Sequence, residues 1–145
     1  MIRDAKNDDM ESVLELMKQL SNHEFTKTQF MDCYSYNLNR GCVLVYEENN
    51  IVSGCLVFNI HYRMHYSRKT AEIVNFIVDK NARNQGIGKQ MLTELEKIAA
   101  QNECVIIEVA SGKKRESAHR FYYREGFICD HYKFTKELQN ATNFL

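Results

Sequence analysis

One stretch, residues 73–100, constrains the fold more than any other part of the sequence. It begins with a nearly continuous apolar run of strand length, Ile73–Val78. Residues 79–82 break this run, and residues 83–89 lead into a long amphipathic helix that extends to Ala100. The pattern therefore predicts a buried strand, a short loop and a helix in direct succession.

The loop of this stretch has the composition of an anion-binding site. Gly86 and Gly88 allow a ligand to approach the backbone closely, and the first N–H groups of a helix lack intrahelical acceptors. Arg83 and Lys89 add positive charge beside them. The alternative is that the two glycines only shape a strand-to-helix turn, but the flanking charges favour a ligand such as a diphosphate.

The composition predicts a single globular domain, residues 1–145, with residues 139–145 as a loose tail. The formal net charge is zero, so no global field favours nucleic acid or an anionic membrane. No apolar stretch approaches the about 18 residues needed to cross a bilayer, and the N-terminal residues are too acidic for a signal peptide. Five scattered cysteines without a CxxC pair indicate reduced, packed thiols. We therefore expect a cytoplasmic protein whose partners include neither nucleic acid nor a membrane.

The remaining periodicity predicts alternating strands and helices. Strands are expected at residues 2–5, 42–46, 51–60, 104–109, 127–129 and 132–138, and helices at about 10–20, 28–39 and 116–124. Gly54 inside the second arm of a hairpin indicates a bulge or a close backbone approach. The polar segment 61–69 is expected to interrupt the pattern before the central strand. This order predicts an α/β protein with a mixed sheet and helices on both faces.

Two spaced motifs resemble those of the GNAT acetyltransferase superfamily. Arg83-x-x-Gly86-x-Gly88, between a strand and a helix, is similar to its acyl-CoA loop. About 30 residues further along, the sequence AHRFYYREGF from Ala118 resembles its A-x-x-FY-x-x-x-GF signature. The resemblance covers nearly the whole chain. It implies a GNAT-like, mostly antiparallel central sheet with a splayed central strand pair, and acetyl-CoA as the acetyl donor.

The resemblance also implies positions for the donor. In this superfamily the acyl-CoA arm lies between the splayed strands, so its amides would pair with the backbone of Ile77 and Val78. The residues that the resemblance implies for the rest of CoA are Arg83, Gln85, Gly86, Ile87, Gly88, Lys89 and Arg115. Arg115 replaces an Asn that many members carry, and Lys80-Asn81 replaces a common Pro.

Two residues are candidates for the chemistry. An alkyl ammonium has an ordinary pKa of about 10, so a base must remove its proton before transfer. Glu72, at the entry of the central strand, is the candidate base, acting directly or through water; the alternative is a solvent-exposed or ion-paired carboxylate. Tyr122 holds the position whose hydroxyl, in the resembling family, faces the CoA sulfur, and is the candidate acid; the alternative is an aromatic packing residue. No cysteine is arranged with a histidine as a nucleophile, so direct transfer is favoured over an acetyl-enzyme.

A narrower resemblance concerns the acceptor. The segments 61–73 and 116–138 are similar to those of aminoalkylphosphonate N-acetyltransferases. The candidate substrate residues are Arg63, His65, Arg68 and His131, because guanidinium and imidazolium groups suit a phosphonate; the alternative is a solvated basic loop. His61 and His65 alone are weak evidence for zinc, so no metal is predicted.

The sequence thus predicts an N-acetyltransferase that acts on a small-molecule amine, which the narrower resemblance identifies as an aminoalkylphosphonate. A polyamine or protein acetyltransferase on the same fold and a non-catalytic CoA-binding sensor are the alternatives. A phosphate- or nucleotide-binding module is weaker, because the pattern GxGxxG is absent. The oligomeric state, including a homodimer, stays open.

Overall fold

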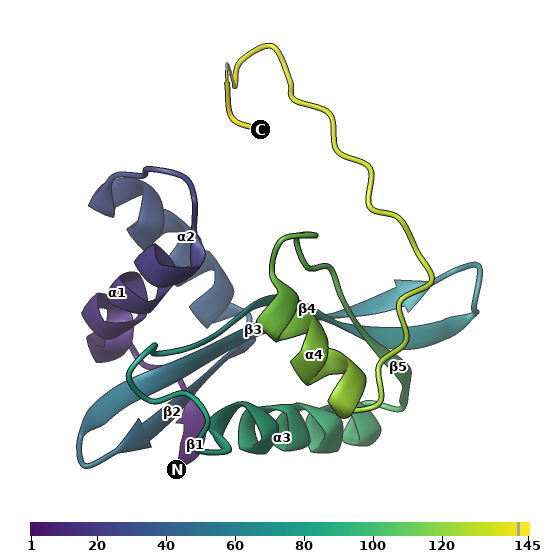
Figure 1. The fold of residues 1–145 in the computed structure, drawn as a ribbon, viewed down its shortest axis with the longest axis horizontal. Coiled ribbons are helices and arrows are strands. Elements are labelled where there is room, and N and C mark those ends of the chain that lie inside the picture. Colours follow the sequence, from purple (N-terminus) through teal and green to yellow (C-terminus); the bar gives the residue numbers. More distant parts are fainter. Residues whose placement is uncertain (142) are drawn as a thin grey trace. The chain divides into compact units, whose positions relative to one another are not determined.

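The computed structural model describes residues 1–141 and 143–145, and they form two compact units, residues 1–109 and 110–145. The first unit is built on a five-stranded sheet whose strands lie in sequence order (Figure 1). The first three pairs of neighbours are antiparallel, and β4 and β5 are parallel. The strands are β1 (Ile2–Asp4), β2 (Val43–Glu48), β3 (Ile51–Arg63), β4 (Arg68–Val78) and β5 (Cys104–Val109). The predicted mixed, mostly antiparallel sheet is confirmed.

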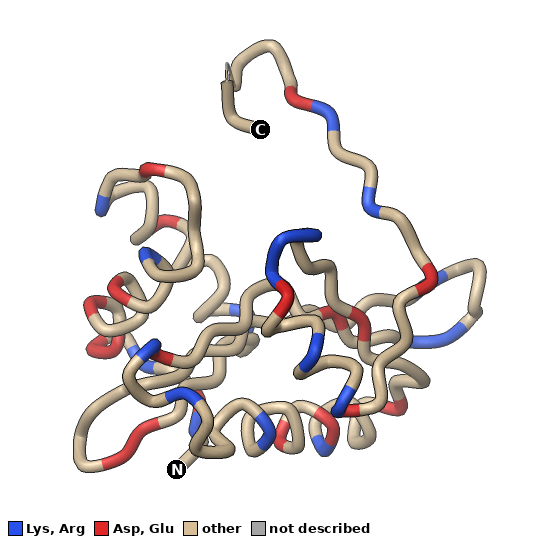
Figure 2. Tube along the Cα trace, in the orientation of Figure 1, with Lys and Arg blue, Asp and Glu red and all other residues tan. Residues whose placement is uncertain are grey.

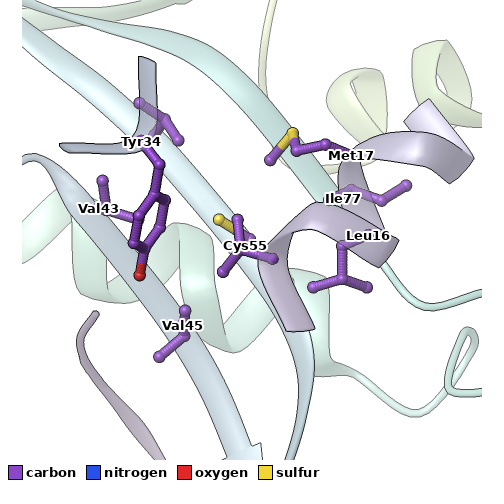
Figure 3. Close-up of a cluster of buried hydrophobic side chains, with 9 residues drawn as sticks. Leu16, Met17, Tyr34, Val43, Val45, Cys55 and Ile77 are labelled. Atoms are coloured by element: carbon purple, nitrogen blue, oxygen red, sulfur yellow. The ribbon is translucent and has the colours of Figure 1, made fainter. Parts of the chain in front are cut away.

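Helices cover both faces of this sheet. A 3₁₀ turn, η1 (Asn7–Asp9), leads into α1 (Met10–Leu20), and α2 (Lys27–Asn39) begins after a capping box in which Thr26 and Gln29 bond each other's backbone amides. Side chains of α1 and α2 pack on one face of β2, β3 and β4 (Figure 3). The labelled members of this cluster are Leu16, Met17, Tyr34, Val43, Val45, Cys55 and Ile77.

The opposite face carries α3 (Ile87–Gln101), whose buried side chains include Met91, Leu92 and Leu95. Gly54 in β3 lies where α3 comes close to the sheet, because a Cβ at this position would lie 2.7 Å from Met91 Sδ. The pairing of β2 with β3 shifts register next to this glycine, because Tyr46 pairs with Gly54 but Glu47 pairs with Val52. Both features predicted for this glycine, a bulge and a close approach, are confirmed.

The predicted interruption at residues 61–69 is wrong. β3 continues to Arg63 and β4 begins at Arg68, so that residues 64–67 form only a tight turn. Ser67, with φ of 50°, completes this turn. Polar side chains do not prevent strand formation here, because the hydrogen bonds of the ladder are made by the backbone. Consequently Glu72 lies within β4, not at its entry.

A second register shift divides β4. Val57 pairs with Asn75, but Phe58 pairs with Ile73, so Val74 is an extra residue on β4 that faces no partner in β3. Beyond Ile73, which pairs with Val109, the recorded register with β5 ends while β4 continues to Val78. The two parallel strands therefore share only the first half of β4, as expected for a splayed pair.

In the second unit, the described residues include α4 (Glu116–Arg124), at its predicted position. The strands predicted at residues 127–129 and 132–138 are wrong: these described residues belong to no strand. Their apolar alternation satisfies one requirement of a strand, but the ladder also needs a paired edge. The predicted tail, residues 139–145, includes position 142, which lies outside the described residues.

Charge is distributed in both signs along the chain (Figure 2). In the part of the chain that the structure describes, no helix has both the length and the apolar character that a bilayer crossing demands. All five cysteines are free thiols, and burial raises the pKa of Cys55 to about 12, so that this residue packs as a neutral thiol.

A partly buried ion pair connects β1 to the start of α1 and gives a stability prediction. Asp9 accepts hydrogen bonds from Arg3 Nη1 at 2.7 Å and Nη2 at 2.9 Å, and from the Lys6 amide at 2.7 Å. The Arg3 hydrogen bonds hold the pKa of Asp9 below its ordinary value. We expect Asp9→Asn to lower the free energy of unfolding by roughly 2–3 kcal/mol at pH 7.

The pH dependence follows from the sign of that shift. A carboxylate with a lowered pKa in the folded state stabilises fully above its unfolded value, about pH 4, and less as the pH falls through the folded value. Urea unfolding between pH 3 and 7 should therefore show wild type and Asp9→Asn converging in acid. Glu15→Gln, which removes an exposed pair with Lys18, is the matched control and should change stability by less than about 0.5 kcal/mol. An equal loss at every pH would contradict the role of the ionised carboxylate.

Candidate functional site

The start of α3 presents unpaired backbone donors. Gly86 is the N-cap in a left-handed conformation with φ of 80°, and no side chain caps the helix. The first helical hydrogen bond runs from the Gln90 amide to the Gly86 carbonyl, at 3.1 Å. The N–H groups of Ile87, Gly88 and Lys89 therefore come before the first hydrogen bond of the helix and can donate to an anion.

The strand that precedes this loop ends beside it. The side chain of Ile77 is buried. The carbonyl of Val78 accepts a hydrogen bond from Arg83 Nε, at 3.1 Å. Arg83 thus folds back to the end of β4, while Gln85 and Lys89 are exposed. These loop residues fit an anionic ligand such as the CoA diphosphate, because free amides and basic side chains lie together without an acidic cap. Arg115 lies in the second unit, where it is the N-cap of α4.

Polar side chains gather on one face of the sheet, on β3, β4 and β5. Partners in a ladder point to the same side, and alternate residues share a face. By the recorded register, this face carries a group that we call the polar cluster: His61, Arg63, Thr70, Glu72 and Glu108. The apolar residues Cys55 and Val57, which pack under α1 and α2, continue the same face along β3. The face thus changes from core to polar surface along one strand.

Hydrogen bonds organise the polar cluster into two sets. Glu72 Oε1 lies 3.1 Å from His61 Nε2. Arg63 donates from Nη2 to Glu108 Oε1 at 2.5 Å and from Nε to Thr70 Oγ1 at 3.3 Å. Thr70 is fully buried, whereas the four ionisable side chains are each about one-third exposed. The cluster is therefore accessible to a ligand and internally ordered.

The cluster brings two carboxylates side by side. Glu72 and Glu108 are direct partners in the parallel register of β4 and β5. Like charges in such positions repel, so each carboxylate needs a nearby donor or cation. His61 supplies it for Glu72 and Arg63 for Glu108. The alternative predicted for Glu72, a paired surface carboxylate, describes part of what is found, but the partner is a histidine with a titratable ring.

Tyr122 in the second unit is enclosed by aromatic neighbours. Its ring lies 5.5 Å from that of Phe121 and 5.3 Å from that of Phe127, in edge-on arrangements. Burial raises the pKa of the Tyr122 phenol, and the positive charge of Arg115 opposes this rise. The hydroxyl is therefore protonated at neutral pH, as a proton donor must be. Tyr123, the next residue on α4, is exposed.

The predicted acceptor-binding residues are distributed between the two units. Arg63 and Arg68 are direct cross-strand partners, and His65 lies in the turn between them, with its ring 4.2 Å from that of Tyr66. His131 belongs to the second unit, where its Nδ1 lies 2.6 Å from Asp130. The first unit thus brings three of the four together on the β3–β4 hairpin.

Sequence reasoning missed Glu108 and the contact between His61 and Glu72. Glu108 is the one charged residue in the apolar run Cys104–Val109, a signal that was visible in the sequence. In the sequence, His61 stands out only as half of a possible metal-binding pair with His65. Among residues 1–141 and 143–145, no group of three or more His, Cys, Asp or Glu side chains is arranged to hold a metal ion.

Comparison with known proteins supports one family. The family model described as "Acetyltransferase (GNAT) family" matches residues 10–127. The aminoalkylphosphonate N-acetyltransferase of Salmonella typhimurium is 32% identical over 140 residues, which cover 94% of this chain and 90% of that protein.

Solved structures agree at the level of the fold. A putative acetyltransferase from Agrobacterium tumefaciens superimposes with a TM-score of 0.82 at 22% identity, covering 95% of this chain and 99% of that one. AAC(6')-Iy, solved with the bisubstrate analogue CoA-S-monomethyl-acetylneamine, has a TM-score of 0.82 at 14% identity, with 95% and 97% covered. Both share the open mixed sheet described above. The chain belongs to the GNAT family of acetyltransferases and is an N-acetyltransferase.

Proposed function

We propose that the protein transfers an acetyl group from acetyl-CoA directly to the primary amine of an aminoalkylphosphonate. The carrying observation is the basic β3–β4 hairpin beside a carboxylate. Arg63 and Arg68 are cross-strand partners on the face that carries Glu72, and they provide positive charge for a phosphonate. The similarity to the Salmonella enzyme supports this choice of acceptor.

The proposal gives each candidate residue one task. The amides that open α3, with Arg83, Gln85 and Lys89, bind the CoA diphosphate, and Arg115 contributes to the same ligand. Arg63, His65, Arg68 and His131 bind the acceptor's phosphonate. Acetyl-CoA supplies the acetyl group as an activated thioester.

The chemical step then needs a base and an acid. Glu72 takes a proton from the acceptor ammonium, directly or through water, which frees the nitrogen lone pair for attack. The Tyr122 hydroxyl donates its proton to the departing CoA sulfur. We further propose that residues 1–145 act as one catalytic domain in the cytoplasm, without a metal.

The structure adds one observation in favour of a second acceptor class. Glu72 and Glu108 lie side by side, and paired carboxylates attract a polycation such as a polyamine. Arg63 is bonded to Glu108, which leaves less negative charge for this purpose. The second candidate function is therefore polyamine acetylation on the same site.

A panel of acceptors tests the proposal. Thiol release from acetyl-CoA should be fastest with short aminoalkylphosphonates, and kcat/KM for them should exceed that for spermidine by about 100-fold or more, since a site built to pair an anion rejects a ligand that lacks it. Alkylamines of matched length without the phosphonate are the control. A preference for spermidine would select the second candidate. Tight CoA binding without turnover on any amine would indicate a sensor.

A further inference from the structure

The base candidate Glu72 has an imidazole neighbour that the proposed reaction does not yet use. Asn59 is the direct cross-strand partner of Glu72, and His61 pairs with Thr70, so that His61 is the diagonal neighbour of Glu72 on the same face. Long and aromatic side chains bridge this diagonal distance. Here the bridge is the 3.1 Å approach of His61 Nε2 to Glu72 Oε1.

The chemistry of the two atoms determines the direction of this hydrogen bond. An ionised carboxylate only accepts, and an unprotonated ring nitrogen also only accepts, so that two such atoms at 3.1 Å would repel. With Glu72 ionised, the 3.1 Å approach requires a proton on His61 Nε2, and His61 is then the donor. This holds for the neutral Nε2–H tautomer and for the imidazolium alike.

The surroundings of Glu72 make that donor valuable. From β5, Glu108 faces Glu72 with a second negative charge, and Arg63 from β3 is already bonded to Glu108 and Thr70. Without His61, the carboxylate would face a like charge with no hydrogen-bond donor of its own. It would also be free to turn toward Arg63.

We propose that His61 is a positioning residue, which donates a hydrogen bond to Glu72 and so holds this carboxylate in place for proton abstraction. The inference rests on the proposed function. In the step, the N–H bond of the acceptor ammonium breaks, a new O–H bond forms on Glu72, and the electron pair remains on the amine nitrogen. His61 keeps its Nε2 proton, and the proton on Glu72 later leaves to solvent.

Substitution of His61 tests the role in the whole enzyme. His61→Ala should lower kcat/KM for the acceptor by about 10-fold or more, with KM for acetyl-CoA unchanged. His61→Gln, whose amide N–H can replace Nε2–H, should restore most of the rate. His23→Ala, in the loop between α1 and α2, is the control and should match wild type.

Two outcomes would overturn the inference. Wild-type kcat/KM in His61→Ala would show that Glu72 needs no partner. A folded His61→Gln that is as impaired as His61→Ala would exclude a role as hydrogen-bond donor. Thermal unfolding of each variant verifies the fold.

A measurement independent of turnover separates this inference from the proposed function. In nitrogen-detected NMR of the wild type, the His61 ring should carry a proton on Nε2, and this proton should exchange with water faster in Glu72→Ala, which removes the acceptor. Unchanged exchange refutes the pairing even if the enzyme is active. If no amine is acetylated but the exchange becomes faster, the proposed function fails and the pairing stands.

Discussion

Tyr122→Phe is expected to lower kcat by about 100-fold and to leave acetyl-CoA binding nearly unchanged. The substitution removes only the hydroxyl, so the edge-on packing of the ring against Phe121 and Phe127 is kept. Because burial raises the pKa of Tyr122, its proton is available at neutral pH and is lost only in strongly alkaline solution. Wild-type kcat should therefore fall in alkali as the phenol ionises, and the variant should lack this limb.

Stopped-flow and calorimetric measurements can test both halves of this expectation. Single-turnover rates with saturating acetyl-CoA report the chemical step, and titration with CoA reports binding. Tyr123→Phe removes a hydroxyl from the exposed neighbour on the same helix and should behave as wild type. A Tyr122→Phe enzyme with unchanged turnover would assign the residue to packing alone.

Glu72→Gln should lower the rate by about 100-fold, and the deficit should be greatest at low pH. The acceptor is almost entirely an ammonium there, so removal of its proton limits the reaction most. At high pH a growing fraction of the amine is neutral and needs no base, so the two enzymes should converge. The glutamine keeps the shape and can still bond to His61, which confines the effect to proton transfer.

The measurement is the pH dependence of kcat/KM for the acceptor in wild type and variant. Glu48→Gln, which alters an exposed carboxylate of another strand, is the matched control. Parallel profiles for wild type and Glu72→Gln would argue against the base. A constant deficit at every pH would instead point to a role for Glu72 in acceptor binding.

The sequence was most informative where structure depends on local pattern. Residues 104–109 and 116–124 form the expected strand and helix with the expected ends, because periodicity and a following glycine determine them. The loop at residues 83–89 was predictable for the same reason, because glycines and unpaired amides at the start of a helix are local features.

It was less informative where structure depends on pairing across the chain. The strand character of residues 61–63 and 68–72 is not apparent from their polar composition and follows from their ladder with each other. The position of Glu108 beside Glu72 depends on the parallel register of β4 and β5, which has no local signal. The strands predicted at residues 127–129 and 132–138 show the opposite error, because the sequence alternates as in a strand but no ladder forms.

The extra residue at Val74 determines which side of the protein carries the proposed chemistry. On β4, Ile77 and Asn75 share the face of Cys55 and Val57, whereas Ile73 shares the face of Phe58, toward α3. In a regular strand of the same sequence, Ile73 would face α1 and α2, and Glu72 would point into the apolar interior beneath α3. The bulge thus keeps an aliphatic side chain in the core and a carboxylate outside it, because regular pairing of the same residues would exchange the two. The irregular pairing of this strand is as much a determinant of reactivity as the residues it contains.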